Sequence, residues 1–218
     1  MVPPPPPAPA GLLPDDLRLL QSPGEALPIV KRTAGARGVL RSLARTIAPS
    51  DHAALLERRM RASLDASKGV GIAAPQIGIS ARAILVMHGA RPAVPGGETH
   101  PLVQWYLNPR IVERSDEVTL DYEGCLSVDD VCGLVRRHRA VVVEHGLDGS
   151  TPQRIEALGF DARIFQHEID HLDGVLYVDR VEGSLQPKDK IKELREQLRR
   201  DHPELVSARS APVDTVML

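Results

Sequence analysis

Residues 166–172, Gln-His-Glu-Ile-Asp-His-Leu, contain the pattern His-Glu-x-x-His. On a helix, His167 and His171 lie one turn apart on the same face, so both imidazoles can bind one metal ion. Glu168, next to the first histidine, can reach a water molecule on that metal and act as general base or acid. Because patterns of five residues also arise by chance, an ordinary helix with two histidines is the alternative interpretation.

The third metal ligand has two candidates. A catalytic metal normally takes three ligands from the protein and leaves one position open for water. A metzincin would have a histidine where Tyr177 stands, which excludes that class. A gluzincin takes a glutamate from a later helix, and Glu193 lies at a workable separation, although its charged neighbours favour a solvent-facing helix. Cys125, beside Gly124, is the other candidate, because a thiolate is a stronger donor than a carboxylate.

Two glycines, Gly69 and Gly71, lie upstream of these residues. Glycines spaced by one residue allow the backbone to turn sharply or to come close to a ligand. The third glycine of a dinucleotide-binding loop is missing and no Gly-Lys-Ser/Thr follows, so neither that loop nor a phosphate loop is indicated. On their own, the glycines favour a structural turn before a strand expected at 83–87.

Composition indicates one globular domain. The chain has 218 residues, a net charge of −2 and 3% aromatic residues, so its core must consist of Val, Leu, Ile and Ala. This charge gives no footprint for nucleic acid or an anionic membrane. Cys125 and Cys132 form no disulfide framework, which suits a reducing cytosol. With no apolar run long enough for a bilayer and no signal-peptide pattern, we expect a cytoplasmic protein.

Three helices are expected to position the site. Capping residues and an apolar stripe predict the first at 50–66. The second, at 160–172, carries His-Glu-x-x-His, and Phe160 and Ile164 share the face of the two histidines. The third begins with a proline and covers 187–200 as a charged surface helix with a narrow apolar stripe.

Short apolar segments predict strands at 83–87, 105–107, 118–122, 141–144, 154–158 and 175–178. We expect 141–144 and 154–158 to pair across a turn at 145–152. Segment 89–101, rich in glycine and proline, is predicted to be an exposed loop. Because the elements do not alternate as β-α-β, they indicate an α+β fold with short antiparallel sheets packed around a central helix that carries the metal-binding motif.

The two ends of the chain are expected to lie outside this domain. Residues 1–14 are rich in proline and are predicted to be a disordered extension that favours polyproline II. Residues 15–203 are predicted to form the catalytic domain, and 204–218 a loose C-terminal tail.

Three motifs, in this order, resemble the signatures of the peptide deformylase family: Gly-x-Gly-x-Ala-Ala-Pro-Gln at 69–76, Glu-Gly-Cys-Leu-Ser at 123–127 and Gln-His-Glu-x-Asp-His at 166–171. The similarity extends from about residue 50 to 180, and its further matches are Leu107-Asn108-Pro109, Ala162-Arg163 and Leu172-x-Gly174. The resemblance implies a metal-dependent hydrolase that removes the N-formyl group from formylmethionine at the N-terminus of newly synthesised proteins.

The resemblance also implies a metal site and a mechanism. Cys125, His167 and His171 should hold one divalent ion, most often ferrous iron (Fe2+) in the family, with Zn2+, Ni2+ or Co2+ as alternatives. A water in the fourth position would lose its proton more easily beside the metal and attack the formyl carbon. Glu168 would take this proton and deliver it to the departing amine.

Further residues are implied around the reacting group. The Gln76 side-chain amide and the backbone N–H of Leu126 should stabilise the developing oxyanion together with the metal. Gly71 should present its backbone to the substrate peptide. The residues expected to wall the methionine pocket are Val70, Phe160 and Ile164.

Around the site, Glu123 is expected to be buried and Asp170 to pair with Arg137. The family often has a proline after Ser-Val and then a peptide-contacting arginine, whereas this chain has Asp129-Asp130 and Val131-Cys132-Gly133. The difference concerns peptide affinity and not the metal centre.

N-formylmethionyl nascent peptides are the implied substrates, and the ribosome near its exit tunnel is a candidate partner of the basic C-terminal helix. Two other hypotheses remain at this point. One is a zinc endopeptidase that uses Glu193. The other is a non-catalytic protein that binds metal or peptide.

Overall fold

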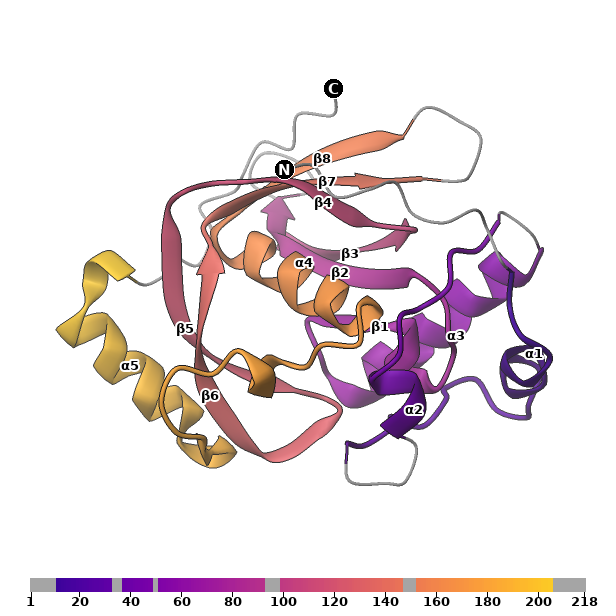
Figure 1. Ribbon diagram of the computed structural model, residues 1–218, viewed down its shortest axis with the longest axis horizontal. Helices are drawn as coiled ribbons and strands as arrows, with labels where there is room; N and C mark the ends of the chain where they lie inside the picture. Colours follow the sequence, from indigo (N-terminus) through magenta and orange to yellow (C-terminus); the bar gives the residue numbers. More distant parts are fainter. Residues whose placement is uncertain (1–10, 33–36, 49–50, 93–98, 147–151, 206–218) are drawn as a thin grey trace.

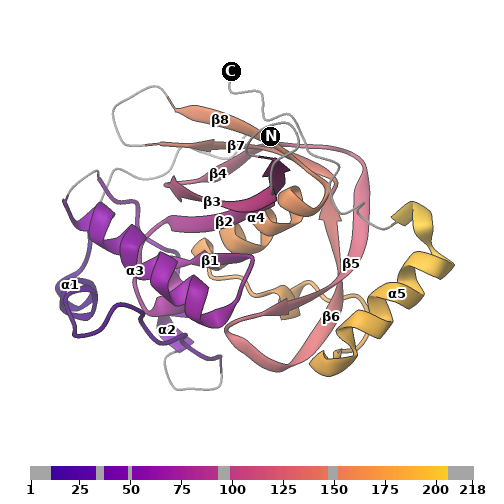
Figure 2. The same cartoon turned by 180° about the vertical axis from the view of Figure 1, so that it is seen from behind.

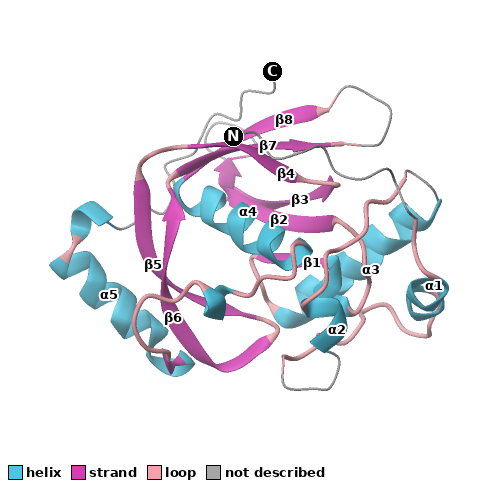
Figure 3. Ribbon diagram, viewed as in Figure 1, coloured by secondary structure: helices cyan, strands magenta, loops and turns pink. Residues whose placement is uncertain are grey.

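The computed structural model describes residues 11–32, 37–48, 51–92, 99–146 and 152–205 (Figure 1). It combines helices with three antiparallel sheets, and Figure 3 shows how these two kinds of element are distributed. The N-terminal helices lie at one end of the molecule and the C-terminal helix lies at the other. No helix within these described ranges combines the length and the apolar character needed to cross a bilayer.

The first sheet contains β1 (Gly71–Ala73), β2 (Ala83–Pro92) and β3 (Thr99–Leu107), in that order. Helix α3 (Asp51–Ser67) packs against β1 and β2. Its apolar stripe is fully buried, at 1% exposure or less, and consists of Leu56, Met60 and Leu64. The shorter helices α1 (Pro14–Leu20) and α2 (Arg37–Leu40) and the 3-10 helix η1 (Ala74–Ile77) complete this end.

The other two sheets also have three strands each. One has the order β4 (Arg110–Arg114), β7 (Ala140–His145), β8 (Gln153–Leu158). The second has the order β5 (Val118–Cys125), β6 (Val128–His138), β9 (Gln186–Pro187). The predicted antiparallel pair is confirmed, because β7 and β8 pair from Ala140↔Leu158 to His145↔Gln153.

Helix α4 (Gly159–Leu172) carries the two histidines and contacts strands of all three sheets. Its apolar side chains belong to one core cluster with residues of β2, β7 and β8. Burial of each large apolar side chain stabilises the fold by about 1.5 to 3 kcal/mol, so this helix is held firmly against the sheets. It ends at Leu172 with Asp173 as its C-cap residue, and Gly174 follows with a left-handed φ of 73°.

After α4 the chain forms the 3-10 helix η2 (Tyr177–Asp179), then β9, the 3-10 helix η3 (Lys188–Lys190), α5 (Ile191–Asp201) and the 3-10 helix η4 (Pro203–Leu205). Helix α5 contacts β5, and both views show it on the outside of the β5–β6 pair (Figure 2).

Two predicted elements are wrong, and the helix predicted at 187–200 begins only at Ile191, after β9 and η3. The loop expected at 89–101 is mostly strand, because β2 and β3 continue to pair at Arg91↔His100 and Pro92↔Thr99, and only 93–98 lie outside the described residues. Pairing of backbone groups here overrides the low strand propensity of glycine and proline. The strand expected at 175–178 is η2 instead, since the backbone N–H of Leu176 donates to the Asp179 carboxylate and closes a short helical turn.

Candidate active site and metal centre

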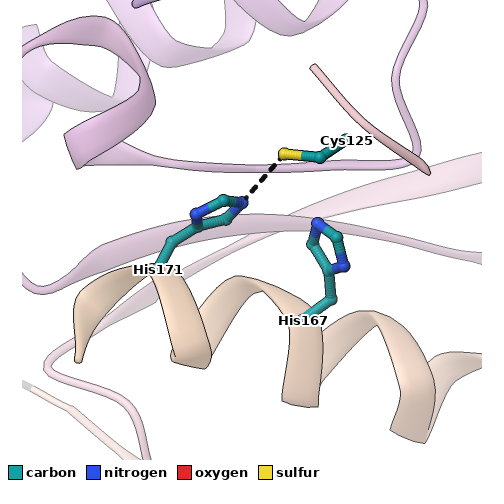
Figure 4. Close-up of side chains that lie close together, drawn as sticks. All are labelled: Cys125, His167 and His171. Carbon is teal, nitrogen blue, oxygen red and sulfur yellow. Dashed lines mark hydrogen bonds between the residues drawn. The ribbon is translucent and has the colours of Figure 1, made fainter. Parts of the chain in front are cut away.

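Cys125, His167 and His171 come together although 42 residues separate the first two. Strand β5 ends at Cys125, and Leu126-Ser127 form the turn into β6, which directs the thiol toward α4. The ligand atoms of the three residues lie within 4.8 Å of one another, and Cys125 Sγ is 3.2 Å from His171 Nε2. Figure 4 shows both imidazoles facing the sulfur. Glu193 is exposed on α5 and does not belong to this group.

The charges of this group favour a bound cation. Burial raises the pKa of Cys125, but the charges of His171 and His167 and their hydrogen bonds to the thiol together hold it well below its usual value. Burial lowers the pKa of His167, but hydrogen bonds with Cys125 and Glu123 raise it well above its usual value. The anionic thiolate and carboxylate of this site therefore favour a positive charge beside them. One thiolate and two imidazoles are a suitable donor set for a divalent transition metal with one open position.

A buried ionic network fixes the first histidine. Glu123 Oε2 lies 2.9 Å from His167 Nδ1, which leaves Nε2 free to face Cys125. The carboxylate also accepts hydrogen bonds from Arg137 and Arg163 at 2.7–3.0 Å. Burial raises the pKa of Glu123, but the charge of Arg137 and the hydrogen bonds with His167 and Arg137 hold it well below its usual value. Arg137 also pairs with Asp170, so the predicted ion pair is present.

Glu168 is buried beside the metal group. Its exposed fraction is 4%, and Oε2 has no hydrogen-bond partner among the described residues. Burial raises its pKa to about 7. A carboxyl group with this pKa can both accept and release a proton near neutrality.

The Gln76 side chain has a fixed orientation. Its Oε1 accepts a hydrogen bond of 2.8 Å from the backbone N–H of Ala73. Its Nε2 is therefore directed toward the site, where it lies 3.4 Å from Cys125 Sγ and from Ser127 Oγ. The amide donor expected for an oxyanion thus lies at the cysteine, which the η1 turn after β1 explains.

One pocket of about 390 Å³ adjoins the metal group. This volume lies within the range of small-ligand sites. The sequence-predicted residues that line it are Val70, Gly71, Gln76, Cys125, Leu126, Phe160, Ile164, His167 and Glu168. His171 is 1% exposed and lies behind this surface. The structure thus brings the expected residues together around a space large enough for a methionine side chain.

A further wall of this pocket was not predicted from the sequence, and it is formed by Lys188, Ile191 and Arg195. The apolar stripe of the last helix was the only signal, and it was interpreted as ordinary surface packing. Cys132 does not line the pocket. It is fully buried, and its thiol lies 3.5 Å from the backbone carbonyl of Pro187 in β9.

Comparison with known proteins agrees with this geometry. The model of the family described as Polypeptide deformylase matches residues 28–186. The chain is 40% identical over 174 residues to "Peptide deformylase 2" of Gloeobacter violaceus, covering 76% of this chain and 87% of the relative. It is 45% identical over 125 residues to "Peptide deformylase 2" of Nostoc sp., covering 57% of this chain and 69% of the relative.

Solved structures give the same result. A Met-Ala-Ser-bound class I type b peptide deformylase from Acinetobacter baumannii has a TM-score of 0.61 and 37% identity, covering 72% of this chain and 98% of that chain. An inhibitor complex of the Plasmodium falciparum peptide deformylase has a TM-score of 0.59 and 29% identity, covering 79% of this chain and 97% of that chain. The chain therefore belongs to the polypeptide deformylase family, the metal-dependent hydrolases that remove the N-formyl group from newly synthesised peptides.

Proposed function

We propose that this chain hydrolyses the formyl amide of N-formylmethionyl peptides, with Cys125, His167 and His171 as ligands of one divalent ion. The observation that carries the proposal is the buried Glu168 carboxylate next to these ligands, whose Oε2 has no hydrogen-bond partner in the described part of the chain, in a pocket that Gly71 also lines. We further propose Fe2+ as the native ion, with Zn2+, Ni2+ or Co2+ able to replace it. When bound, such an ion polarises the formyl carbonyl and makes a water molecule more acidic.

Glu168 holds and moves the proton in this proposal. With a pKa of about 7, its carboxylate can accept the proton of the attacking water and then donate it to the amine nitrogen of the peptide. Its position on α4, one residue after His167, keeps it beside the reacting group.

Gln76 and Leu126 stabilise the negative charge that develops on the formyl oxygen. The Nε2 of Gln76 is held toward Cys125, which supports its role as a donor to this oxygen. The backbone N–H of Leu126 follows the cysteine in the β5–β6 turn. Donors that are fixed before the reaction cost no reorganisation when the charge forms.

The methionine side chain of the substrate lies between Val70, Phe160 and Ile164. Val70 lines the pocket and is 45% exposed, so its side chain is accessible to a bound substrate. The Gly71 backbone then lies along the peptide.

The remaining sequence predictions are retained as proposals. We infer a catalytic domain over 15–203 with extensions at 1–14 and 204–218, and a central position for α4. Residues 1–10 and 206–218 lie outside the described residues, whereas Leu12 packs against the core and α1 begins at Pro14, so the folded part begins a few residues earlier. We also propose that the protein acts in the cytoplasm on nascent chains, and that the exposed basic residues of α5 contact the ribosome near its exit tunnel.

Formate release tests the proposed function. Protein prepared without oxygen and loaded with iron should release formate from formyl-Met-Ala-Ser, and exposure to air should inactivate it as the iron or Cys125 oxidises. Zinc is bound more tightly than iron by most nitrogen and sulfur sites, so the purified protein should be checked for zinc before the assay. Absence of formate release from protein with stoichiometric iron would refute the proposal.

A further inference from the structure

The C-terminal segment 186–195 is fixed to the sheet that supplies the cysteine. Strand β9 pairs with β6 through Val131↔Pro187 and Cys132↔Gln186. Further along, the Arg195 guanidinium donates to the carbonyl of Tyr122, with Nε at 3.0 Å, and to the carboxylate of Asp121. The segment is therefore a fixed wall of the pocket and not a loose cover.

Lys188 lies in this wall next to the cysteine. Its Nζ is 3.4 Å from the backbone carbonyl of Cys125. Its aliphatic stem passes over Gly124, where an added Cβ would lie 3.4 Å from Lys188 Cε and 3.9 Å from Ile191 Cδ1. The packing of the stem thus places the ammonium group at the rim of the pocket, within reach of a bound peptide.

The uncompensated charge at this rim is positive. Of the two acidic side chains that line the pocket, Glu123 is neutralised by buried arginines, and Glu168 lies in the interior beside the metal group. The exposed cations that line it are Lys188 and Lys68, and within the described ranges neither has a carboxylate partner. Asp189 neighbours Lys188 in sequence but does not line the pocket.

We propose that Lys188, assisted by Lys68, makes this pocket select formylmethionyl peptides that carry an acidic side chain at their second or third residue. The inference rests on the proposed function and adds a specificity to it. A fixed ammonium beside a peptide attracts a carboxylate and repels a second ammonium, and the attraction falls as salt screens it. Exposed pairs are weak, so each lysine should change the preference by about threefold.

The test compares peptides that differ only in charge. Four substrates are amidated at the C-terminus, so that none carries a terminal carboxylate. They are formyl-Met-Glu-Ala-Ala, formyl-Met-Lys-Ala-Ala, formyl-Met-Ala-Glu-Ala and formyl-Met-Ala-Lys-Ala. For at least one pair, we expect kcat/KM to be about fivefold higher for the glutamate peptide at low salt and nearly equal at about 1 M salt. The glutamate-to-lysine ratio is taken within one protein preparation, so differences in metal loading cancel.

Variants then locate the preference. Lys188→Met keeps the aliphatic stem and should lower the ratio about threefold, and Lys188→Glu should invert it. Lys190→Met removes the same charge from an exposed residue two positions away that does not line the pocket, and should leave the ratio unchanged. A wild-type ratio of one for both pairs, or an equal effect of Lys188→Met and Lys190→Met, would overturn the inference.

Binding separates this inference from the proposed function. Calorimetry measures how the deformylated products of the four amidated substrates bind to the metal-loaded protein. These products are Met-Glu-Ala-Ala, Met-Lys-Ala-Ala, Met-Ala-Glu-Ala and Met-Ala-Lys-Ala, all amidated at the C-terminus. The same preference for glutamate is expected, and it should weaken in Lys188→Met. If no formylated peptide is hydrolysed, the proposed function fails, while these titrations still confirm or overturn the charge preference.

Discussion

Gly71 and Glu168 occupy adjoining space so closely that a side chain at position 71 would displace the carboxylate. An added Cβ would lie 2.6 Å from Glu168 Oε1 and 2.9 Å from Ile164 Cγ2. Since real Cβ atoms do not approach other atoms so closely, Gly71→Ala must push the Glu168 carboxylate away from its place beside the metal ligands. The second glycine of the pair therefore serves the site directly.

From this contact we predict that Gly71→Ala lowers kcat by about 10² or more while metal content stays normal, because a small misplacement of a reacting group is costly. Gly38→Ala is the matched control, since an added Cβ there meets nothing within 4 Å. Steady-state kinetics and metal analysis of both variants check the prediction. Full activity of Gly71→Ala would show that the Glu168 carboxylate can shift without loss of its function, and would contradict the prediction.

Glu168→Gln tests the proton-transfer role without altering the size of the side chain. The carboxylate is not among the three candidate ligands, so metal content should remain stoichiometric. Loss of a general acid–base group should lower kcat by about 10² to 10⁴. Near-normal turnover of the metal-loaded variant would contradict the assignment.

Cys125→Ser and Glu193→Gln distinguish the two possible third ligands. Serine replaces a thiolate by a poorly ionised hydroxyl, so Cys125→Ser should lose most metal binding and nearly all activity. Glu193 is exposed on α5, so Glu193→Gln should bind metal and turn over normally. Cobalt-loaded protein provides the readout through a thiolate charge-transfer band in the near ultraviolet. We expect the band in the wild type and in Glu193→Gln, and its absence in Cys125→Ser.

Much of the site was predictable because several of its residues lie close together in the sequence at helical spacing. His167, Glu168 and His171 lie on one helix, and a period of 3.6 residues places them together without knowledge of the fold. Their relation to Cys125 was not available from periodicity, because it depends on β5 extending three residues beyond the predicted strand and turning at Leu126-Ser127.

The missed elements are those held by tertiary pairing. Strand β6 carries charges at Asp129, Asp130 and Arg136, which argue against a strand by propensity, yet it pairs with β5 from Val118↔His138 to Cys125↔Val128. The position of Cys132 also depended on a distant segment. The family resemblance places it in the stretch where a peptide-contacting arginine often lies, whereas here it pairs with β9.

Cys132→Arg is consequently predicted to act on stability and not on substrate binding. The side chain at this position is fully buried, with its sulfur against the Pro187 carbonyl, so a guanidinium would have to displace β9 or lose its hydration in the interior. We expect the free energy of unfolding to fall by about 3 kcal/mol or more. Cys132→Ala, which removes the thiol without adding bulk, should cost much less. A stable Cys132→Arg protein with altered KM would contradict this placement.

Glu144, which is distant in sequence from the metal ligands, supports a prediction about how the stability of the fold depends on pH. Its side chain is 9% exposed and accepts two hydrogen bonds each from Arg110 and Arg154, which join β4, β7 and β8. Burial raises the pKa of this carboxyl, but the hydrogen bonds outweigh burial and lower it below its usual value. A group with a lowered pKa in the folded state stabilises the fold above its unfolded pKa, here about 4.3, and loses this contribution as pH falls through the folded pKa.

Glu144→Gln should therefore lower the free energy of unfolding by about 1 to 3 kcal/mol at pH 7, because the arginines lose a charged partner. The difference between wild type and variant should shrink as pH falls below about 4.3, where the carboxyl of the unfolded wild type begins to be protonated, and should disappear as pH passes the lower pKa of the folded state. Denaturant unfolding at several pH values measures it. Glu117→Gln is the control, because Glu117 and Arg139 pair with side chains 70% and 60% exposed, and it should change stability by less than about 1 kcal/mol at any pH. A pH-independent difference for Glu144→Gln would mean that packing of the side chain, and not its charge, stabilises this sheet.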